Sequence, residues 1–150
     1  RAARAAQRFG SRRKMIDELL SPAQWQGVSL AQTLRATFPI IVAGYQARQG
    51  LLRAFLEQAS RDIRFRQTWS IVGDHITARV TELVMSRLDE VNHPEPERGI
   101  RLGLRMVFAT LAHQMQMHEI DDPEMDVLTE ELIIVMLRHM GIPDESQQSA

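Results

Sequence analysis

One Glu-x-x-His pattern occurs in the sequence, at Glu90 and His93. Helical proteins build di-iron carboxylate sites from this pattern, but such a site needs two copies on facing helices. No other histidine has a glutamate three residues before it, and the single copy runs into Pro94 at the end of a predicted helix. His113 and His118 lie five residues apart, which places them on different faces of a helix. We therefore expect no metal site.

The motifs of nucleophilic and phosphate chemistry are missing as well. The chain contains no cysteine, which excludes a thiol nucleophile, a thiolate zinc site and a disulfide. It contains no His-Glu-x-x-His motif, no P-loop and no Gly-x-Gly-x-x-Gly fingerprint, and no serine or threonine sits in a nucleophile elbow. We predict no catalytic residue and no cofactor, and we expect that the protein is not an enzyme.

A pocket for a small molecule is the kind of site that these residue types favour. The larger aromatic side chains are distributed over four predicted helices, and sites between helices are typically apolar with a few polar groups. His75 lies nearly two turns after Trp69 and adds a polar group that could orient a ligand. The alternative is that the same residues only fill the core. The candidate ligand-binding residues are Phe38, Val42, Tyr45, Phe55, Trp69, His75 and Phe108.

Helices must position these residues. Strong helix formers dominate, and no segment alternates with a two-residue period, so strands are not expected. The predicted fold class is all-α, an antiparallel bundle of about six helices. Ser21 and Pro22 are the expected cap and first residue of one short turn, which carries Trp25 and ends at Gly27. The helices are expected over about 1–20, 30–45, 51–60, 62–91, 97–117 and 124–140.

Several helix ends carry local signals. Ser29, followed three residues later by Gln32, has the capping-box pattern and predicts the start of the second helix. Pro39 lies inside that helix and removes one backbone hydrogen bond, so we expect a kink just before it. Gly141 and Pro143 close the sixth helix in the usual C-terminal order.

Length and charge bound the class of protein. A chain of 150 residues with 44% hydrophobic and 25% charged residues is typical of one globular domain. Its net charge of −1 gives the whole chain no preference for nucleic acid, although residues 1–14 are basic and residues 119–131 carry acids but no base. The longest apolar run, 132–137, is too short to span a bilayer, and no signal peptide is visible. We expect a cytoplasmic protein with no membrane partner.

The last two predicted helices are apolar on more than one side. In the fifth helix Leu102, Met106 and Ala109 form a second face beside the main one. A helix of this kind must be buried on more than one side, and at the edge of a domain this requires a partner. We therefore predict a homodimer with an intermolecular four-helix bundle. The alternative is a central place in the core of a monomer. The candidate interface residues are Leu104, Phe108, Leu111, Met115, Leu128, Leu132, Val135 and Met136.

Four segments, in order, resemble the TetR family of transcriptional regulators. They read SPAQWQGVSLAQTLRA, YQARQGLLRAFLEQASRDIRFRQ, HPEPERGIRLGLRMVFATL and LTEELIIVMLRHMGIP, within about residues 15–143. The joint RQGLLRAFLEQASRD and the closing segment are the most specific. Ile63 departs from the pattern, since relatives often have proline there; only the local turn should change.

The resemblance implies a function. TetR regulators join an N-terminal helix-turn-helix headpiece to an all-helical domain, which binds an effector between its helices and dimerises through its last two long helices, here 97–117 and 124–140. We expect 1–143 to be that second domain, with 1–20 as the tail of the linking helix and 144–150 as a disordered tail. The headpiece, and with it contact with operator DNA, is expected to be missing from this chain. The effector is an unknown small apolar or amphipathic molecule; the alternative is a helical dimerisation module with no ligand.

Overall fold

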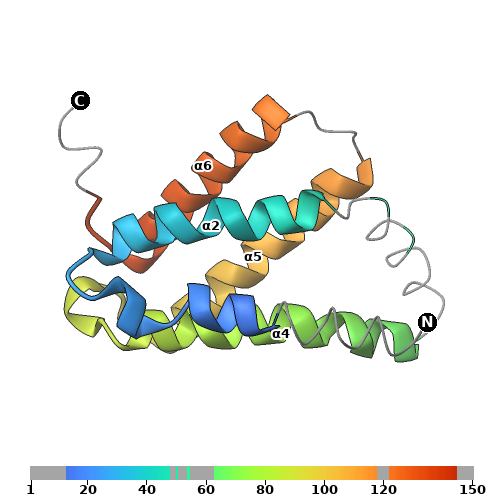
Figure 1. Cartoon of the computed structure of the whole chain (residues 1–150). Helices are drawn as coiled ribbons and strands as arrows, with labels where there is room; N and C mark the ends of the chain where they lie inside the picture. Colours follow the sequence, from blue (N-terminus) through green and yellow to red (C-terminus); the bar gives the residue numbers. More distant parts are fainter. Residues whose placement is uncertain (1–12, 48–49, 51–53, 55–62, 118–121, 145–150) are drawn as a thin grey trace.

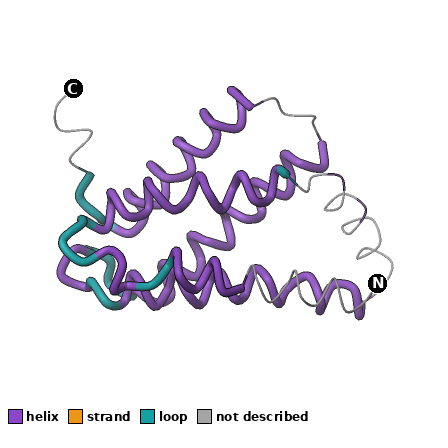
Figure 2. The backbone as a smooth tube through the Cα atoms, viewed as in Figure 1, coloured by secondary structure: helices purple, strands orange, loops and turns teal. Residues whose placement is uncertain are grey.

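The computed structural model describes the backbone of residues 13–47, 50, 54, 63–117 and 122–144, and side chains within 13–47, 50, 54, 73–114 and 123–144. In these ranges the regular secondary structure is helical, without a strand, which confirms the all-α class (Figures 1 and 2). Residues 13–19 form a helix. The elements that follow are η1 (Pro22–Trp25), α2 (Leu30–Gln46), α4 (Ile63–Met85), η2 (Leu88–Glu90), α5 (Pro96–Met117) and α6 (Asp122–Met140).

Local signals place the beginning of α2 correctly. The hydroxyl of Ser29 accepts a hydrogen bond from the backbone N–H of Gln32 at 3.2 Å, as an N-cap does. The helix then continues through Pro39. Ser21 behaves differently, because its side chain makes no capping bond to η1, although Pro22 does occupy the first turn. Of the predicted helix 51–60 only residue 54 is described, as helical, and of the predicted tail 144–150 only Asp144 is described.

The predicted end of the fourth helix is wrong. We expected it near residue 91, but α4 ends at Met85 and the chain passes through Arg87 in a non-helical conformation, with φ −137° and ψ 48°. The cause is tertiary, since the Arg87 guanidinium donates to the backbone carbonyls of Trp25 and Val28, sixty residues away in sequence. A local pattern cannot report such a contact, so the short helix η2 takes the place of the last predicted turns.

The predicted end of α6 is confirmed. Gly141 has φ +62°, and the N–H of Ile142 donates to the carbonyl of Leu137 at 2.9 Å, while the N–H of Gly141 donates to that of Arg138 at 3.1 Å. These two bonds are the Schellman motif. A Cβ atom at Gly141 would lie 2.5 Å from the carbonyl oxygen of Asn92, so glycine is required both for its backbone angle and for this approach.

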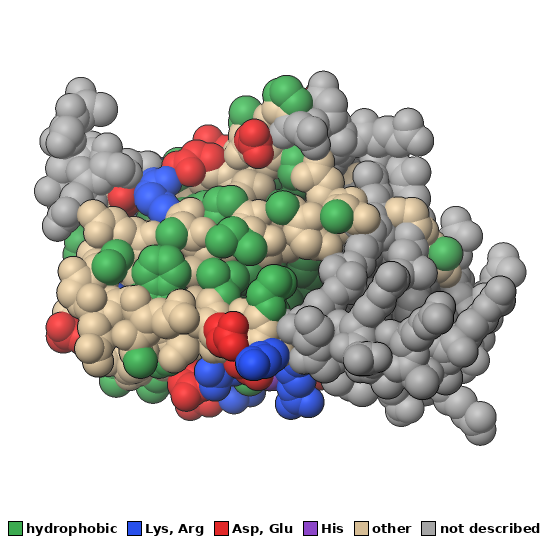
Figure 3. All heavy atoms as spheres, in the orientation of Figure 1, with side chains coloured by type: hydrophobic (Ala, Val, Ile, Leu, Met, Phe, Trp, Pro, Cys, Tyr) green, Lys and Arg blue, Asp and Glu red, His purple; other side chains and the backbone are tan. Residues whose placement is uncertain are grey.

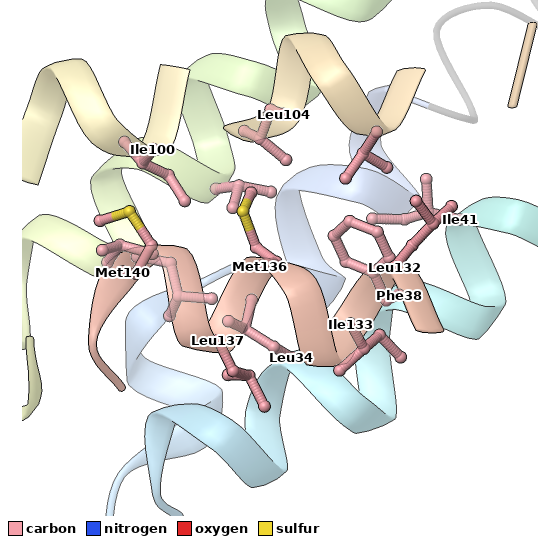
Figure 4. Packing of buried hydrophobic residues seen from close by; sticks show 14 of the residues in the cluster. Leu34, Phe38, Ile41, Ile100, Leu104, Leu132, Ile133, Met136, Leu137 and Met140 are labelled. Atoms are coloured by element: carbon pink, nitrogen blue, oxygen red, sulfur yellow. The ribbon is translucent and has the colours of Figure 1, made fainter. Parts of the chain in front are cut away.

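The helices pack in the order α4, α5, α6 and α2, because α5 contacts both α4 and α6 while α6 also contacts α2 (Figure 1). Apolar side chains of α2 and α5 point at the inner side of α6 and form the core shown in Figure 4. Arg35 of α2 adds a polar tie, since it pairs with Glu130 of α6 and with Asp144 beyond it. None of the described helices has the length and apolar content needed to cross a lipid bilayer.

Candidate functional site

An aromatic pair joins the end of α2 to the middle of α5. The ring centroids of Tyr45 and Phe108 lie 5.7 Å apart, and the ring planes are inclined by 39°. This geometry is the tilted arrangement that aromatic rings prefer. Both side chains are half-buried and pack against the core from its edge. Among the predicted ligand-binding residues whose side chains are described, these two are brought together and remain partly accessible.

The environment of the Tyr45 hydroxyl disfavours charge. Burial raises the pKa of Tyr45 to about 12, because the phenolate would lose its hydration there. The hydroxyl is therefore harder to ionise than that of an exposed tyrosine. The same loss of hydration would penalise a charged group of a ligand at this place, so the pair suits an uncharged, apolar or aromatic group.

Phe38 and Val42 are buried in the core. They precede Tyr45 on α2, but only 3% and 2% of their surfaces are exposed. In Figure 4 the Phe38 ring points at α6, among the other core side chains. In this conformation they offer almost no surface to a ligand; they belong to the core cluster against which Tyr45 and Phe108 pack.

Two further predicted residues are not described at the level of side chains. Phe55 lies outside the described residues, and Trp69 lies in α4 at a position where only the backbone is described. Figure 3 shows hydrophobic side chains gathered in the middle of the face that carries α2. The predicted contribution of Phe55 and Trp69 to a pocket therefore stays a prediction.

His75 lies beside an acidic side chain. Its Nε2 atom lies 2.8 Å from Oδ1 of Asp17, in the helix 13–19, and Nε of Arg79 lies 3.2 Å from the same oxygen. Both nitrogens are buried, and neither makes a hydrogen bond to a residue that the structure describes. These contacts join α4 to the helix 13–19, and the predicted role of His75 toward a ligand stays a prediction.

The Glu-x-x-His residues make backbone contacts. The Glu90 carboxylate accepts a hydrogen bond of 2.7 Å from the N–H of Leu30, at the beginning of α2. Nδ1 of His93 accepts one of 3.0 Å from the N–H of Glu95, just before α5. Among the residues that the structure describes, no group of three or more histidine, aspartate or glutamate side chains is placed to hold a metal ion.

Four of the candidate interface residues are buried in the chain's own core. Helical spacing separates two stripes but does not say which one faces inward. The exposed surface is 0% for Leu104, 2% for Leu111, 9% for Leu132 and 2% for Met136, so none offers area to a partner in this conformation. Phe108 and Leu128 are half-buried, and the side chain of Met115 is not described.

The outer sides of α5 and α6 do carry exposed apolar residues. Leu102 and Met106 of α5 are 47% and 43% exposed, and Val127 and Val135 of α6 are 66% and 51% exposed. Of these, the list of interface candidates contained only Val135. The sequence did indicate Leu102 and Met106, because the helical spacing places them on the second apolar face of the fifth helix.

An open groove lies between the end of α4 and the first turns of α5, away from the aromatic pair. Three arginines of α5 and the side chain of Met85 line it, together with Leu102. Arg98 and Arg101 are already paired with Glu95 and Glu97. The groove contains none of the predicted ligand-binding residues, and its exposed, charged lining differs from the apolar pocket expected between helices.

Comparison with known proteins does not assign the chain. No family model, no curated protein and no solved structure matches it.

Proposed function

We propose that the chain is the effector-binding and dimerisation domain of a TetR-type transcriptional regulator that works in the cytoplasm. The ordered resemblance of four segments supports the family, and the all-helical fold is compatible with it. DNA recognition is assigned to a helix-turn-helix headpiece outside these residues. The observation that carries the proposal is the row of exposed apolar side chains on the outer sides of α5 and α6.

A second copy of the chain is the proposed partner of that surface. Leu102, Met106, Val127 and Val135 are each exposed over two fifths of their surface or more, and they lie on two neighbouring helices. Burying them against the same residues of another copy gains about 25 cal/mol for each Å² of apolar area. A two-fold axis then brings two helices from each subunit together as a four-helix bundle.

The effector is proposed to bind at Tyr45 and Phe108. These rings belong to different helices, so a ligand that contacts both favours one placement of α2 relative to α5. A ligand shifts an equilibrium only as far as it binds one state better than the other. In an intact regulator, the shifted helices change the separation of two headpieces and thus their fit to two operator half-sites.

A helical dimerisation module without a ligand is the second candidate. The burial of Phe38 and Val42 favours it, because the chain's own side chains fill space that a ligand was predicted to occupy. The two candidates share the dimer and differ only in the effector.

Thermal unfolding with a panel of small, uncharged aromatic and apolar compounds separates these candidates. A compound present at 100 times its Kd adds about 2.7 kcal/mol to the free energy of unfolding. We expect at least one compound to raise the Tm of the wild type. The same compound should fail with Phe108→Ala, and it should still act on Leu102→Ala, the matched change on the outer side. A complete panel without effect would support the module that has no ligand.

Analytical ultracentrifugation tests the dimer. The wild type is expected to sediment as a dimer at micromolar concentration. Val135→Arg should sediment as a monomer with unchanged helical circular dichroism, because the side chain is half exposed. Leu132→Arg is unsuitable for this purpose, since it places a charge in the core and unfolds the chain. A monomeric wild type would refute the proposed dimer.

A further inference from the structure

The outer side of α6 carries one narrow stripe of exposed residues. It consists of Glu124, Val127, Glu131, Val135 and Arg138, with spacings of three, four, four and three residues, and all five side chains are exposed. At 3.6 residues per turn, these positions fall within about 80° of the helix circumference. Leu132, Ile133 and Met136, which are buried in the core, lie toward the opposite side.

The chemistry of this stripe is symmetric about its centre. Val127 and Val135 each lie four residues from Glu131. Glu124 and Arg138 each lie seven residues from it, with opposite charges. When such a stripe pairs with a copy of itself in the antiparallel direction, valine meets valine and the acid at one end meets the base at the other. Both contacts then occur twice, as two-fold symmetry requires.

Charge favours the antiparallel over the parallel arrangement. In a parallel pair each residue meets its own copy, so Glu124 would face Glu124 and Arg138 would face Arg138. Like charges at neighbouring positions on paired helices are destabilising, whereas opposite charges fix direction and partner choice. Glu124 and Arg138 also interact within the chain, but both remain exposed enough to be reached by a second copy.

We propose that two copies of the chain pair antiparallel along this stripe of α6, with the two-fold axis beside Glu131. The inference rests on the dimer proposed above and adds its direction and register. The stripe is about 21 Å long, at 1.5 Å per residue over fourteen residues. The exposed Leu102 and Met106 of the neighbouring α5 enlarge the contact toward the area that a stable interface buries.

Glu131 makes an unfavourable contact in this pairing. The axis brings its carboxylate close to that of the second copy, and within the described part of the chain Glu131 has no ion pair. Removal of this repulsion should strengthen the dimer. We expect Glu131→Gln to lower the dimer dissociation constant several-fold, as relief of a like-charge contact does. An exposed acid elsewhere, changed by Asp126→Asn, should leave the constant unchanged.

Charge reversal tests the register. Glu124→Arg and Arg138→Glu each replace two attractions by two repulsions, so each should raise the dimer dissociation constant about tenfold at low salt. The double variant Glu124→Arg/Arg138→Glu restores both pairs and should recover the wild-type constant. An equimolar mixture of the two single variants should form heterodimers, because each contact then joins opposite charges. Circular dichroism of each variant checks that the monomer is folded.

The absence of cysteine permits a second, geometric test. Glu131→Cys should be joined to its own copy by a short thiol cross-linker. Val127→Cys alone should not, whereas a mixture of Val127→Cys and Val135→Cys should give a cross-linked heterodimer. Two results would overturn the antiparallel register while leaving dimerisation intact. One is a cross-link between two copies of Val127→Cys; the other is a dimer dissociation constant that neither charge reversal changes. A wild type that is monomeric throughout would instead remove the proposed dimer.

Discussion

The inner and outer sides of α5 and α6 are built from similar residues but lie in opposite environments. Leu104 is fully buried, whereas Leu102, two positions earlier on the same helix, is 47% exposed. Met136 and Val135 are adjacent in sequence, yet one is 2% and the other 51% exposed. The difference teaches that apolar character alone does not define the core of this chain. What distinguishes the sides is the packing of α2 and α4 against only one of them.

Truncation of the two leucines gives the largest expected contrast. Leu104→Ala removes a fully buried side chain and should lower the free energy of unfolding by about 3 kcal/mol, because it leaves a cavity. Leu102→Ala should change it by less than about 0.5 kcal/mol in the monomer. Urea denaturation at low protein concentration measures both. Equal losses would place Leu102 in the core and contradict the division into two sides.

Local sequence signals predicted those parts of the fold that depend on neighbouring residues. The cap at Ser29 and the glycine end of α6 are examples, since each uses hydrogen bonds within a few residues. The two apolar sides of α5 were also visible as helical spacing. The assignment of the inner side was not, because Leu132 and Val135 are both apolar and only tertiary packing separates them.

Long-range contacts account for the other differences. Arg87 ends α4 through bonds to the turn near Trp25, and His75 is held by Asp17. Both contacts join residues about sixty positions apart, which periodicity does not report. For the candidate site, the sequence suggested Tyr45 and Phe108 as two members of a set. The structure distinguishes them from Phe38, whose place in the core depends on α6.

Alanine substitution of two glycines compares a packed with an unpacked position, and the expected change in stability is smaller than for the leucines. A Cβ atom at the buried Gly103 would lie 2.5 Å from Sδ and 2.9 Å from Cε of Met136, on the inner side of α6. At Gly73 of α4 it would meet no atom within 4 Å among the residues that the structure describes. Alanine is a better helix former than glycine by about 1 kcal/mol, so Gly73→Ala should stabilise the chain.

At Gly103 the flexible end of the buried Met136 side chain must move to admit the methyl group, which offsets this gain, so Gly103→Ala should be less stable than Gly73→Ala by about 1 kcal/mol. Differential scanning calorimetry of both variants measures the difference. If Gly103→Ala were as stable as Gly73→Ala, the close approach of α5 and α6 at Met136 would be refuted.

Tyr45 is half-buried, between the buried inner and the exposed outer side chains. Its substitution should have the smallest effect on stability, but its titration reports directly on the candidate site. It is the only tyrosine of the chain, so tyrosinate absorbance belongs to this residue alone. Burial raises its pKa from 10.0 to about 12. The folded state thus favours the neutral phenol, and this contribution to stability is complete below pH 10 and is lost as the pH rises through 12.

We expect a spectrophotometric titration of the folded protein to show a midpoint well above 10, and Tyr45→Phe to reduce the loss of stability between pH 10 and 12. Phe108→Ala should lower the midpoint, because it admits water beside the hydroxyl, whereas Leu102→Ala should not. A midpoint near 10 in the folded wild type would mean that the hydroxyl is hydrated. The aromatic pair would then belong with the outer surface, and the argument for an uncharged ligand at this place would fail.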